Sequence, residues 1–381
     1  MQTVYLDYAA TTPVDPAVAK KMMEYLTPDG CFANPASRAH MMGWFAEQAV
    51  ENGRLQISQV LNCDARELVW TSGATESNNL ALKGVAQTRR SQGNHIITSA
   101  IEHKAVLDTC AWLEDQGFEV TYLKPNAQGV IEPEQVVSAI TEQTILASFM
   151  YVNNELGSIN DITALGSVLH ERDVVFHVDA AQAGGKLAID LKALPVDLMS
   201  FSGHKIYGPK GIGTLYVRRD PDLKVAAQMH GGGHERGMRS GTLPTHQIVG
   251  MAEAFVLANE RIAVDYEHLS ALREQLWQGI SVLDKVSVNG DAANGFPGII
   301  NLCFAGVDGE SLLMAIKEIA VSTGSACNSA NVDPSYVLSG IGLSRDKALS
   351  SLRFSLGRFT SEAEIAQTVE IVVKAVNALR G

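Results

Sequence analysis

Several features are scarce or missing in this chain of 381 residues, and each absence narrows what the protein can be. No apolar run reaches the length of about 18 residues that a membrane-spanning helix needs, so no such helix is expected. The opening residues have neither a basic region nor an apolar core, so no secretory signal peptide is expected. The five cysteines are scattered without a Cys-x-x-Cys pair. This predicts free thiols in a reducing cytoplasm, with no disulfide framework and no metal site of the zinc type.

Positive charge and nucleotide-binding signatures are also lacking. Thirty Lys and Arg residues against 42 Asp and Glu residues give a formal net charge of −12, which argues against direct binding of nucleic acid. The one Gly-Lys dipeptide, Gly185-Lys186, is followed by Leu187, where a phosphate-binding loop needs Ser or Thr. No Gly-x-Gly-x-x-Gly follows an expected strand, which argues against a nicotinamide cofactor.

The composition that remains is that of a folded globular protein, with 46% hydrophobic and 19% charged residues. Short apolar runs alternate with amphipathic stretches from about residue 67 onward, which predicts an α/β fold with a mostly parallel sheet between two layers of helices. A long helix expected over 246–283 leads into a shorter α+β pattern. We therefore expect an N-terminal segment, 1–14, that packs on the small domain, a large domain over 15–245, and a connecting helix with a small C-terminal domain over 246–381.

A lysine and an aspartate follow two of the expected strands. Lys205 lies just after the apolar run 195–201, and burial there would lower its pKa and free the amine to attack a carbonyl. Asp179 ends the apolar run 174–178, and ligands gather at such strand ends in α/β sheets. Taken alone, Lys205 could be a loop lysine and Asp179 a helix N-cap. Together they suit pyridoxal phosphate, whose aldehyde needs a lysine and whose pyridine nitrogen needs a carboxylate.

Three further polar sites follow expected strands. The turn and helix start at 71–77 offer free N–H groups and the hydroxyls of Ser72 and Thr75 to a phosphate, although an ordinary helix cap has the same pattern. His103 suits stacking on a cofactor ring and proton transfer near neutral pH, or else caps a helix. Asn154 suits a hydrogen bond to a ring hydroxyl, or else shapes a turn.

Two residues of the C-terminal part suit substrate chemistry. Arg353 lies among apolar neighbours in an expected strand, so it needs an anion, which is either a substrate carboxylate or a partner in a structural salt bridge. Cys327 lies in a run of small polar residues, which predicts an exposed, reactive thiol. By contrast, Cys110 and Cys303 are expected to be small buried hydrophobic residues.

Nearly the whole chain resembles the cysteine desulfurases, the NifS/IscS-like branch of the class V aminotransferases, which share the pyridoxal phosphate fold type I. The resemblance implies a large domain with a mostly parallel sheet of the seven-stranded type and a small α+β domain. The motifs that carry it occur in family order and are Leu6-Asp7-Tyr8-Ala9-Ala10-Thr11-Thr12-Pro13, Asn34-Pro35-Ala36-Ser37-Arg38, Thr71-Ser72-Gly73-Ala74-Thr75-Glu76-Ser77-Asn78-Asn79, Glu102-His103, Asn153-Asn154-Glu155, His177-Val178-Asp179-Ala180-Ala181-Gln182, Ser202-Gly203-His204-Lys205, the segment 230–243, Gly324-Ser325-Ala326-Cys327 and Arg353.

The resemblance also implies a role for each site residue. Lys205 would bind the cofactor covalently and take the α-proton of L-cysteine, with His103 assisting, and the thiol of Cys327 would attack the substrate sulfur. Asp179 would contact the pyridine nitrogen. The other cofactor contacts implied are His103, Gln182, Asn154, Ala74, Thr75, Ser202, His204 and, reaching the phosphate of the partner subunit in a homodimer, Thr242. The residues implied to bind the substrate are Asn34, Asn154 and Arg353.

The reaction implied is the conversion of L-cysteine to L-alanine, which leaves a persulfide on Cys327 for a sulfur-acceptor protein. The chain ends at Gly381, whereas relatives that serve an iron–sulfur scaffold often extend further. The acceptor therefore stays open among an iron–sulfur scaffold, a tRNA-thiolating enzyme and a DNA phosphorothioation system. An aminotransferase or lyase of the same fold would have no need of Cys327. A non-catalytic sulfur-relay protein would have no need of Lys205 and Asp179, so the presence of both sets favours the desulfurase.

Overall fold

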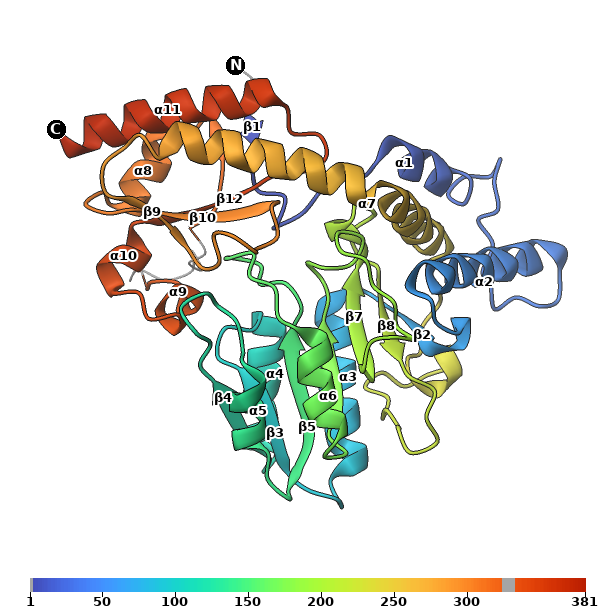
Figure 1. Cartoon of the computed structure of the whole chain (residues 1–381). Helices are drawn as coiled ribbons and strands as arrows, with labels where there is room; N and C mark the ends of the chain where they lie inside the picture. Colours follow the sequence, from blue (N-terminus) through green and yellow to red (C-terminus); the bar gives the residue numbers. More distant parts are fainter. Residues whose placement is uncertain (1–2, 324–332) are drawn as a thin grey trace.

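The computed structural model describes residues 3–323 and 333–381, and Cys327 lies outside these residues (Figure 1). Its largest element is a seven-stranded sheet. The strands of this sheet are β2 (Leu68–Thr71), β3 (His95–Ser99), β4 (Glu119–Leu123), β5 (Thr144–Met150), β6 (Val175–Asp179), β7 (Leu198–Ser202) and β8 (Gly213–Val217). They pair in the order β2-β8-β7-β6-β5-β3-β4, and β8 runs antiparallel to both of its neighbours while the other pairs are parallel. The expectation of a mostly parallel sheet is confirmed.

Helices cover both faces of this sheet, which is why strands such as β3 and β5 are buried along their whole length. Neighbouring strand residues show the two faces, because Ile96 packs in a cluster with α3 and α4, whereas Ile97 packs in the cluster that contains α6. The helices around the sheet are α3 (Ala74–Arg89), α4 (Lys104–Asp115), α5 (Pro133–Ala139) and α6 (Ile162–His170).

A second, antiparallel sheet lies beside the first (Figure 1). Its strands pair in the order β12-β10-β9, and the N-terminal segment reaches it where Asp7 bridges to Ser355. In the same part of the chain, β1 pairs with β11 in a two-stranded sheet. The elements of this part are β1 (Val4–Tyr5), β9 (Val286–Asn289), β10 (Ile299–Phe304), α8 (Gly309–Ala315), β11 (Ile319–Ala320), α9 (Tyr336–Gly340), α10 (Arg345–Leu349), β12 (Ser351–Ser355) and α11 (Glu362–Arg380).

The two parts are linked by the 36-residue helix α7 (Thr245–Ile280), which packs on α11 at one end and on α1 (Pro16–Met23) and α2 (Met41–Leu61) at the other (Figure 1). The start of α1 is as expected, with Asp15 accepting from the N–H of Ala17 and Pro16 in the first helical position. In the part of the chain that the structure describes, no helix has both the length and the apolar content of a membrane span.

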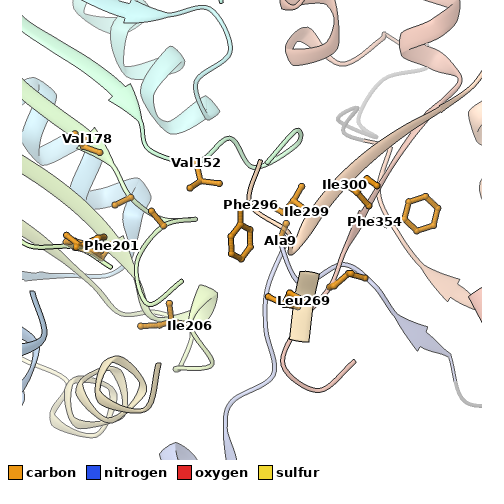
Figure 2. Packing of buried hydrophobic residues seen from close by; sticks show 14 of the residues in the cluster. Ala9, Val152, Val178, Phe201, Ile206, Leu269, Phe296, Ile299, Ile300 and Phe354 are labelled. Carbon is orange, nitrogen blue, oxygen red and sulfur yellow. The ribbon is translucent and has the colours of Figure 1, made fainter. Parts of the chain in front are cut away.

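One apolar core runs through both parts (Figure 2). Val178 and Phe201 come from the large sheet, Ile299 and Phe354 come from the small one, and Phe296 lies between them. All five are at most 3% exposed. Because the core is continuous, the ends of the large sheet and strand β12 are held at a fixed separation, and polar residues at this junction share one cavity.

Candidate active site

A cavity of about 650 Å³ lies between the carboxyl ends of β5, β6 and β7, the N-terminal segment and strand β12. The site residues expected from the sequence that line it are Ala74, Thr75, His103, Asn154, Asp179, Gln182, Ser202, His204, Lys205 and Arg353. Residues from elements and loops that are far apart in the chain thus meet in one place. This is the arrangement that ligand sites in α/β sheets share.

Lys205 ends the short 3₁₀ turn that follows β7. Its Nζ donates to the carbonyl oxygen of Ala10 over 2.8 Å and also to that of Ala9. Burial lowers the pKa of Lys205 to about 8, and the positive charge of Arg353 adds to this effect, while Asp7 and Asp179 oppose it. The amine therefore loses its proton more readily than a surface lysine does, as attack on an aldehyde requires.

Asp179 is the last residue of β6 and is 5% exposed. Its Oδ2 accepts from Nδ2 of Asn78 over 2.7 Å, and its Oδ1 accepts from the N–H of Ala181 over 2.9 Å. These two donors hold the side chain in place, and a carboxylate is the group that a protonated pyridine nitrogen needs as its partner. The bond to Ala181 closes a turn, and no helix begins there among the described residues, so Asp179 does not have the N-cap role that was its alternative.

The start of α3 fits a phosphate group. Its N-cap is Gly73, and no side chain caps the helix there, so the first N–H groups face the cavity without a capping oxygen. His204 lies nearby with Nδ1 3.1 Å from Oγ1 of Thr11. Burial lowers the pKa of His204 to about 4, and the charges of Lys205 and Lys210 contribute. The ring is therefore neutral at pH 7, and when Thr11 donates to Nδ1, the N–H at Nε2 is left to donate to a ligand.

Arg353 combines a structural ion pair with an unused donor. Nη2 pairs with Oδ1 of Asp7 over 2.7 Å, and Nη1 donates to the carbonyl oxygen of Asn154 over 2.8 Å. Both Nε of Arg353 and Oδ1 of Asn154 are buried without a partner among the described residues. Since buried polar atoms are normally hydrogen-bonded, this pair of atoms at the cavity wall fits a bound ligand that carries both acceptors and donors.

His103 and Gln182 also line the cavity. Nδ1 of His103 accepts from the N–H of Ala105 at the start of α4, so a neutral ring carries its proton on Nε2. The helix-capping alternative for His103 is thus present, and it fixes the tautomer. Gln182 donates from Nε2 to the carbonyl oxygen of Ala9 over 2.8 Å, and its Oε1 accepts from Lys186 over 2.6 Å.

Two of the expected residues lie elsewhere in this single chain. Oδ1 of Asn34 accepts from the N–H of Ala36, which makes Asn34 a turn residue, and it does not line the cavity. Thr242 is exposed in the loop before α7 and does not line the cavity either. The roles of both residues stay predictions.

The structure also brings in residues to which the sequence reasoning gave no role. Asn78 holds Asp179, Asp7 holds Arg353, and Thr11 faces His204. A signal existed for Asn78, because it lies four residues after Ala74 and so on the same side of α3 as the expected phosphate site. Asp7 and Thr11 belong to a motif that was recognised, but nothing in its composition indicates which distant residues they contact.

Comparisons with known proteins agree over nearly the full length. Residues 4–368 match the family model described as aminotransferase class-V. The cysteine desulfurase IscS of Escherichia coli (strain K12 / DH10B) is 59% identical over 377 residues, which cover 99% of this chain and 93% of that protein.

Solved structures are similar as well. A NifS-like protein superposes with a TM-score of 0.91 at 34% identity and covers 99% of both chains. SspA in complex with cysteine has a TM-score of 0.84 at 41% identity, covering 94% of this chain and 100% of that one. DndA from Streptomyces lividans has a TM-score of 0.79 at 42% identity, covering 92% and 99%.

Proposed function

We propose, on the premise that this chain belongs to the aminotransferase class-V family and is a pyridoxal phosphate-dependent cysteine desulfurase, that L-cysteine reacts in the cavity around Lys205 and that Cys327 receives its sulfur. The observation that carries this assignment is the meeting of Lys205, Asp179 and Arg353 in one cavity. When bound there, pyridoxal phosphate supplies an electron sink for negative charge on the substrate α-carbon.

The chain holds each end of the cofactor with a different group. Lys205 would bind it covalently, and the carboxylate of Asp179 would pair with the pyridine nitrogen. The start of α3 with Ala74 and Thr75 receives the phosphate, together with Ser202 and His204. Support comes from the uncapped helix start, since it offers N–H donors and the positive end of a helix dipole. His103 and Gln182 complete the contacts to the ring.

Arg353 and Asn154 bind the substrate carboxylate, with Asn34 as a further candidate. The support is the buried Nε of Arg353, which has no partner among the described residues and lies next to a guanidinium edge already fixed by Asp7. A guanidinium that is held in place on one side loses little side-chain entropy when it captures a carboxylate on the other.

The sulfur transfer then follows from the groups around the substrate. Nζ of Lys205 takes the α-proton, and the thiolate of Cys327 attacks the substrate sulfur. The sulfur–carbon bond breaks, its electron pair stays with the β-carbon, and that carbon takes up a proton, for which Nε2 of His103 is a placed donor. Nζ of Lys205 then returns the proton to the α-carbon. The products are L-alanine and a persulfide on Cys327, so sulfur, electrons and protons balance.

A homodimer is the proposed assembly. Exposed apolar residues gather at the start of α2, where Met41 is 62%, Trp44 56% and Phe45 52% exposed, on one helix face by their spacing. The preceding loop adds Phe32, which is 56% exposed. A second copy that covers these residues would also give the exposed Thr242 a phosphate to bind. Analytical ultracentrifugation tests this assembly: a monomer at micromolar concentration would contradict it, and Trp44→Asp with Phe45→Asp should dissociate the dimer.

The persulfide sulfur passes to an acceptor protein in the cytoplasm. An iron–sulfur scaffold, a tRNA-thiolating enzyme and a DNA phosphorothioation system are the three candidates, and pull-down from the native source distinguishes them. We also propose that the chain divides into the segment 1–14, a large domain over 15–245 and a helix with a small domain over 246–381. The pairing of β1 with β11 supports the placement of the first segment.

Product analysis tests the reaction and separates it from its rivals. Wild-type protein with L-cysteine and a reductant should release alanine and sulfide in equal amounts, and Lys205→Ala should release neither. An aminotransferase would instead form a keto acid from the amino acid without equal amounts of sulfide and alanine. A relay protein would form no alanine at all.

A further inference from the structure

An acidic side chain lies beside the expected phosphate site. Glu76 is the third residue of α3 and lines the same cavity as Thr75 and His204. A carboxylate in the first turn of a helix interacts well with the helix dipole. It nevertheless repels a phosphate dianion bound to that same turn, and the repulsion is strong where water is partly excluded. The charge of Glu76 therefore needs compensation.

Arg239 supplies that compensation. Its Nε donates to Oε1 of Glu76 over 2.8 Å, and its Nη2 donates to Oε2 over 3.3 Å. The Arg239 side chain is 16% exposed and the Glu76 side chain 18%, so solvent screens this pair less than a surface ion pair. Oε2 of Glu76 also accepts from the N–H of Ser72 over 2.7 Å. Burial alone would raise the pKa of Glu76, but the bonds from Arg239 and Ser72 outweigh it and lower that pKa.

The loop that carries Arg239 is fixed to the large sheet at a second point. Glu235 forms a two-bond ion pair with Arg54 of α2, with both distances 2.8 Å and both side chains at most 4% exposed. Its Oε2 also accepts from the N–H of Trp70 on β2. Glu235 and Arg236 both have positive φ, a strained backbone that such a buried anchor can hold. The loop is thus anchored to the large sheet four residues before Arg239.

We propose that Arg239 is a positioning residue for the cofactor, which neutralises Glu76 so that the start of α3 accepts a phosphate dianion. This inference rests on the proposed function, in which that helix start receives the phosphate of pyridoxal phosphate. It also links the cofactor site to the loop that carries Thr242, because Arg239 lies three positions before that residue.

The competing explanation is that the ion pair between Arg239 and Glu76 only stabilises the packing of the loop on α3. The two explanations differ in what the charge of Glu76 does once Arg239 is neutral. In the proposed role, the unpaired carboxylate repels the phosphate, and removal of that carboxylate restores binding. If the ion pair is only structural, removal of Glu76 from a protein that already lacks the Arg239 charge should not restore cofactor binding.

Titration of the apoprotein separates the explanations, with the full-length chain, absorbance of bound cofactor as the readout, and thermal unfolding to verify folding. Arg239→Gln should weaken the affinity for pyridoxal phosphate about tenfold through the loss of one compensating charge. Arg239→Lys, which keeps the charge, should bind nearly as the wild type does. The double variant Glu76→Gln with Arg239→Gln should recover most of the lost affinity, because the glutamine oxygen can still accept from Ser72. Arg66→Gln is the matched control, since it removes one arginine charge paired to Asp64 outside the cavity.

The same titrations with pyridoxal, which lacks the phosphate, should show no difference between Arg239→Gln and the wild type. Equal affinities of wild type and Arg239→Gln for pyridoxal phosphate, or a double variant no better than Arg239→Gln, would overturn the inference. If Arg239→Gln does not fold, Glu76→Gln alone decides: binding at least as tight as that of the wild type supports the role of Arg239, and weaker binding refutes it. Wild-type protein that takes up no pyridoxal phosphate would contradict the proposed function itself, which is a different result.

Discussion

Asn78 on helix α3 and Asp179 at the end of strand β6 are joined by a hydrogen bond of 2.7 Å between the side-chain amide and the carboxylate. Both residues are buried, and they are 101 positions apart in the chain. The helix whose N-terminus is the proposed phosphate site thus also holds the carboxylate expected to face the pyridine nitrogen. One element therefore sets the distance between the two ends of the cofactor site.

This relationship leads to a prediction about Asp179. Asp179→Ala should leave the fold intact and severely weaken alanine formation, because the pyridine nitrogen loses the partner that keeps it protonated. Asn78→Ala should have a smaller effect on the reaction and should lower the free energy of unfolding by about 1–3 kcal/mol, the usual cost of an unsatisfied buried acceptor. Alanine formation rates and thermal unfolding measure the two effects. Near-normal alanine production by Asp179→Ala would show that the ring is held in another way.

The pKa of Lys205 predicts how cofactor uptake depends on pH. Burial lowers that pKa to about 8, so below pH 8 the side chain is mostly an ammonium ion that cannot attack an aldehyde, and above pH 8 it is mostly a free amine. The uptake rate of the apoprotein should therefore rise with pH and reach half of its maximum near pH 8. Stopped-flow absorbance measures this rate, and Lys205→Ala should show no covalent uptake. A midpoint near the ordinary lysine value would mean that Lys205 is solvated in the apoprotein.

Arg353 and Arg358 make a matched pair of buried arginines. Arg353 lines the cavity, whereas Arg358 does not and is held by Asp15 and Asp265. Arg353→Ala should raise the KM for L-cysteine roughly ten- to a hundredfold, since the loss of a charge-assisted carboxylate contact costs about 1.5–3 kcal/mol. Arg358→Ala should lower the melting temperature and leave that KM nearly unchanged. If Arg353→Ala binds cysteine normally but melts early, its ion pair with Asp7 is its main role.

Much of the fold follows from apolar patterning. The apolar runs 174–178 and 195–201 contain most of β6 and β7, because a buried strand leaves an apolar run with clear ends. Strand β4 leaves no such run, and the structure gives the reason. It lies at the edge of the sheet beside β3, and none of its five residues is fully buried, so its sequence carries little apolar signal.

Some residues of the candidate site could likewise be predicted from the sequence, and others could not. Lys205 and Asp179 could be predicted because each residue type, at the end of a buried run, already suggests its chemistry. The partners of site residues could not, since Asp7 and Arg353 are 346 positions apart and Glu76 and Arg239 are 163 apart. Such pairs depend on how the N-terminal segment and the loop before α7 pack in three dimensions, which local patterning does not encode.

The remaining prediction concerns which thiol carries the sulfur. Cys110 and Cys303 are buried, as expected, and burial raises the pKa of Cys63 and of Cys110 to about 12. Such thiols form little thiolate near neutral pH and are poor nucleophiles. Cys31 is partly exposed, but it does not line the cavity, and its Sγ faces the carbonyl oxygen of Met42 at 3.6 Å. By elimination and by the motif around it, Cys327 is the expected nucleophile, and Cys327→Ser should bind the cofactor normally yet release almost no sulfide or alanine.

Peptide mass spectrometry after incubation with L-cysteine, without reductant, tests the central claim most directly. The account predicts one added sulfur atom on the peptide that contains Cys327 in wild-type protein, and none in Lys205→Ala, where the cofactor is not held. Added sulfur on a peptide with Cys31, Cys63, Cys110 or Cys303, or normal desulfuration by Cys327→Ser, would contradict it.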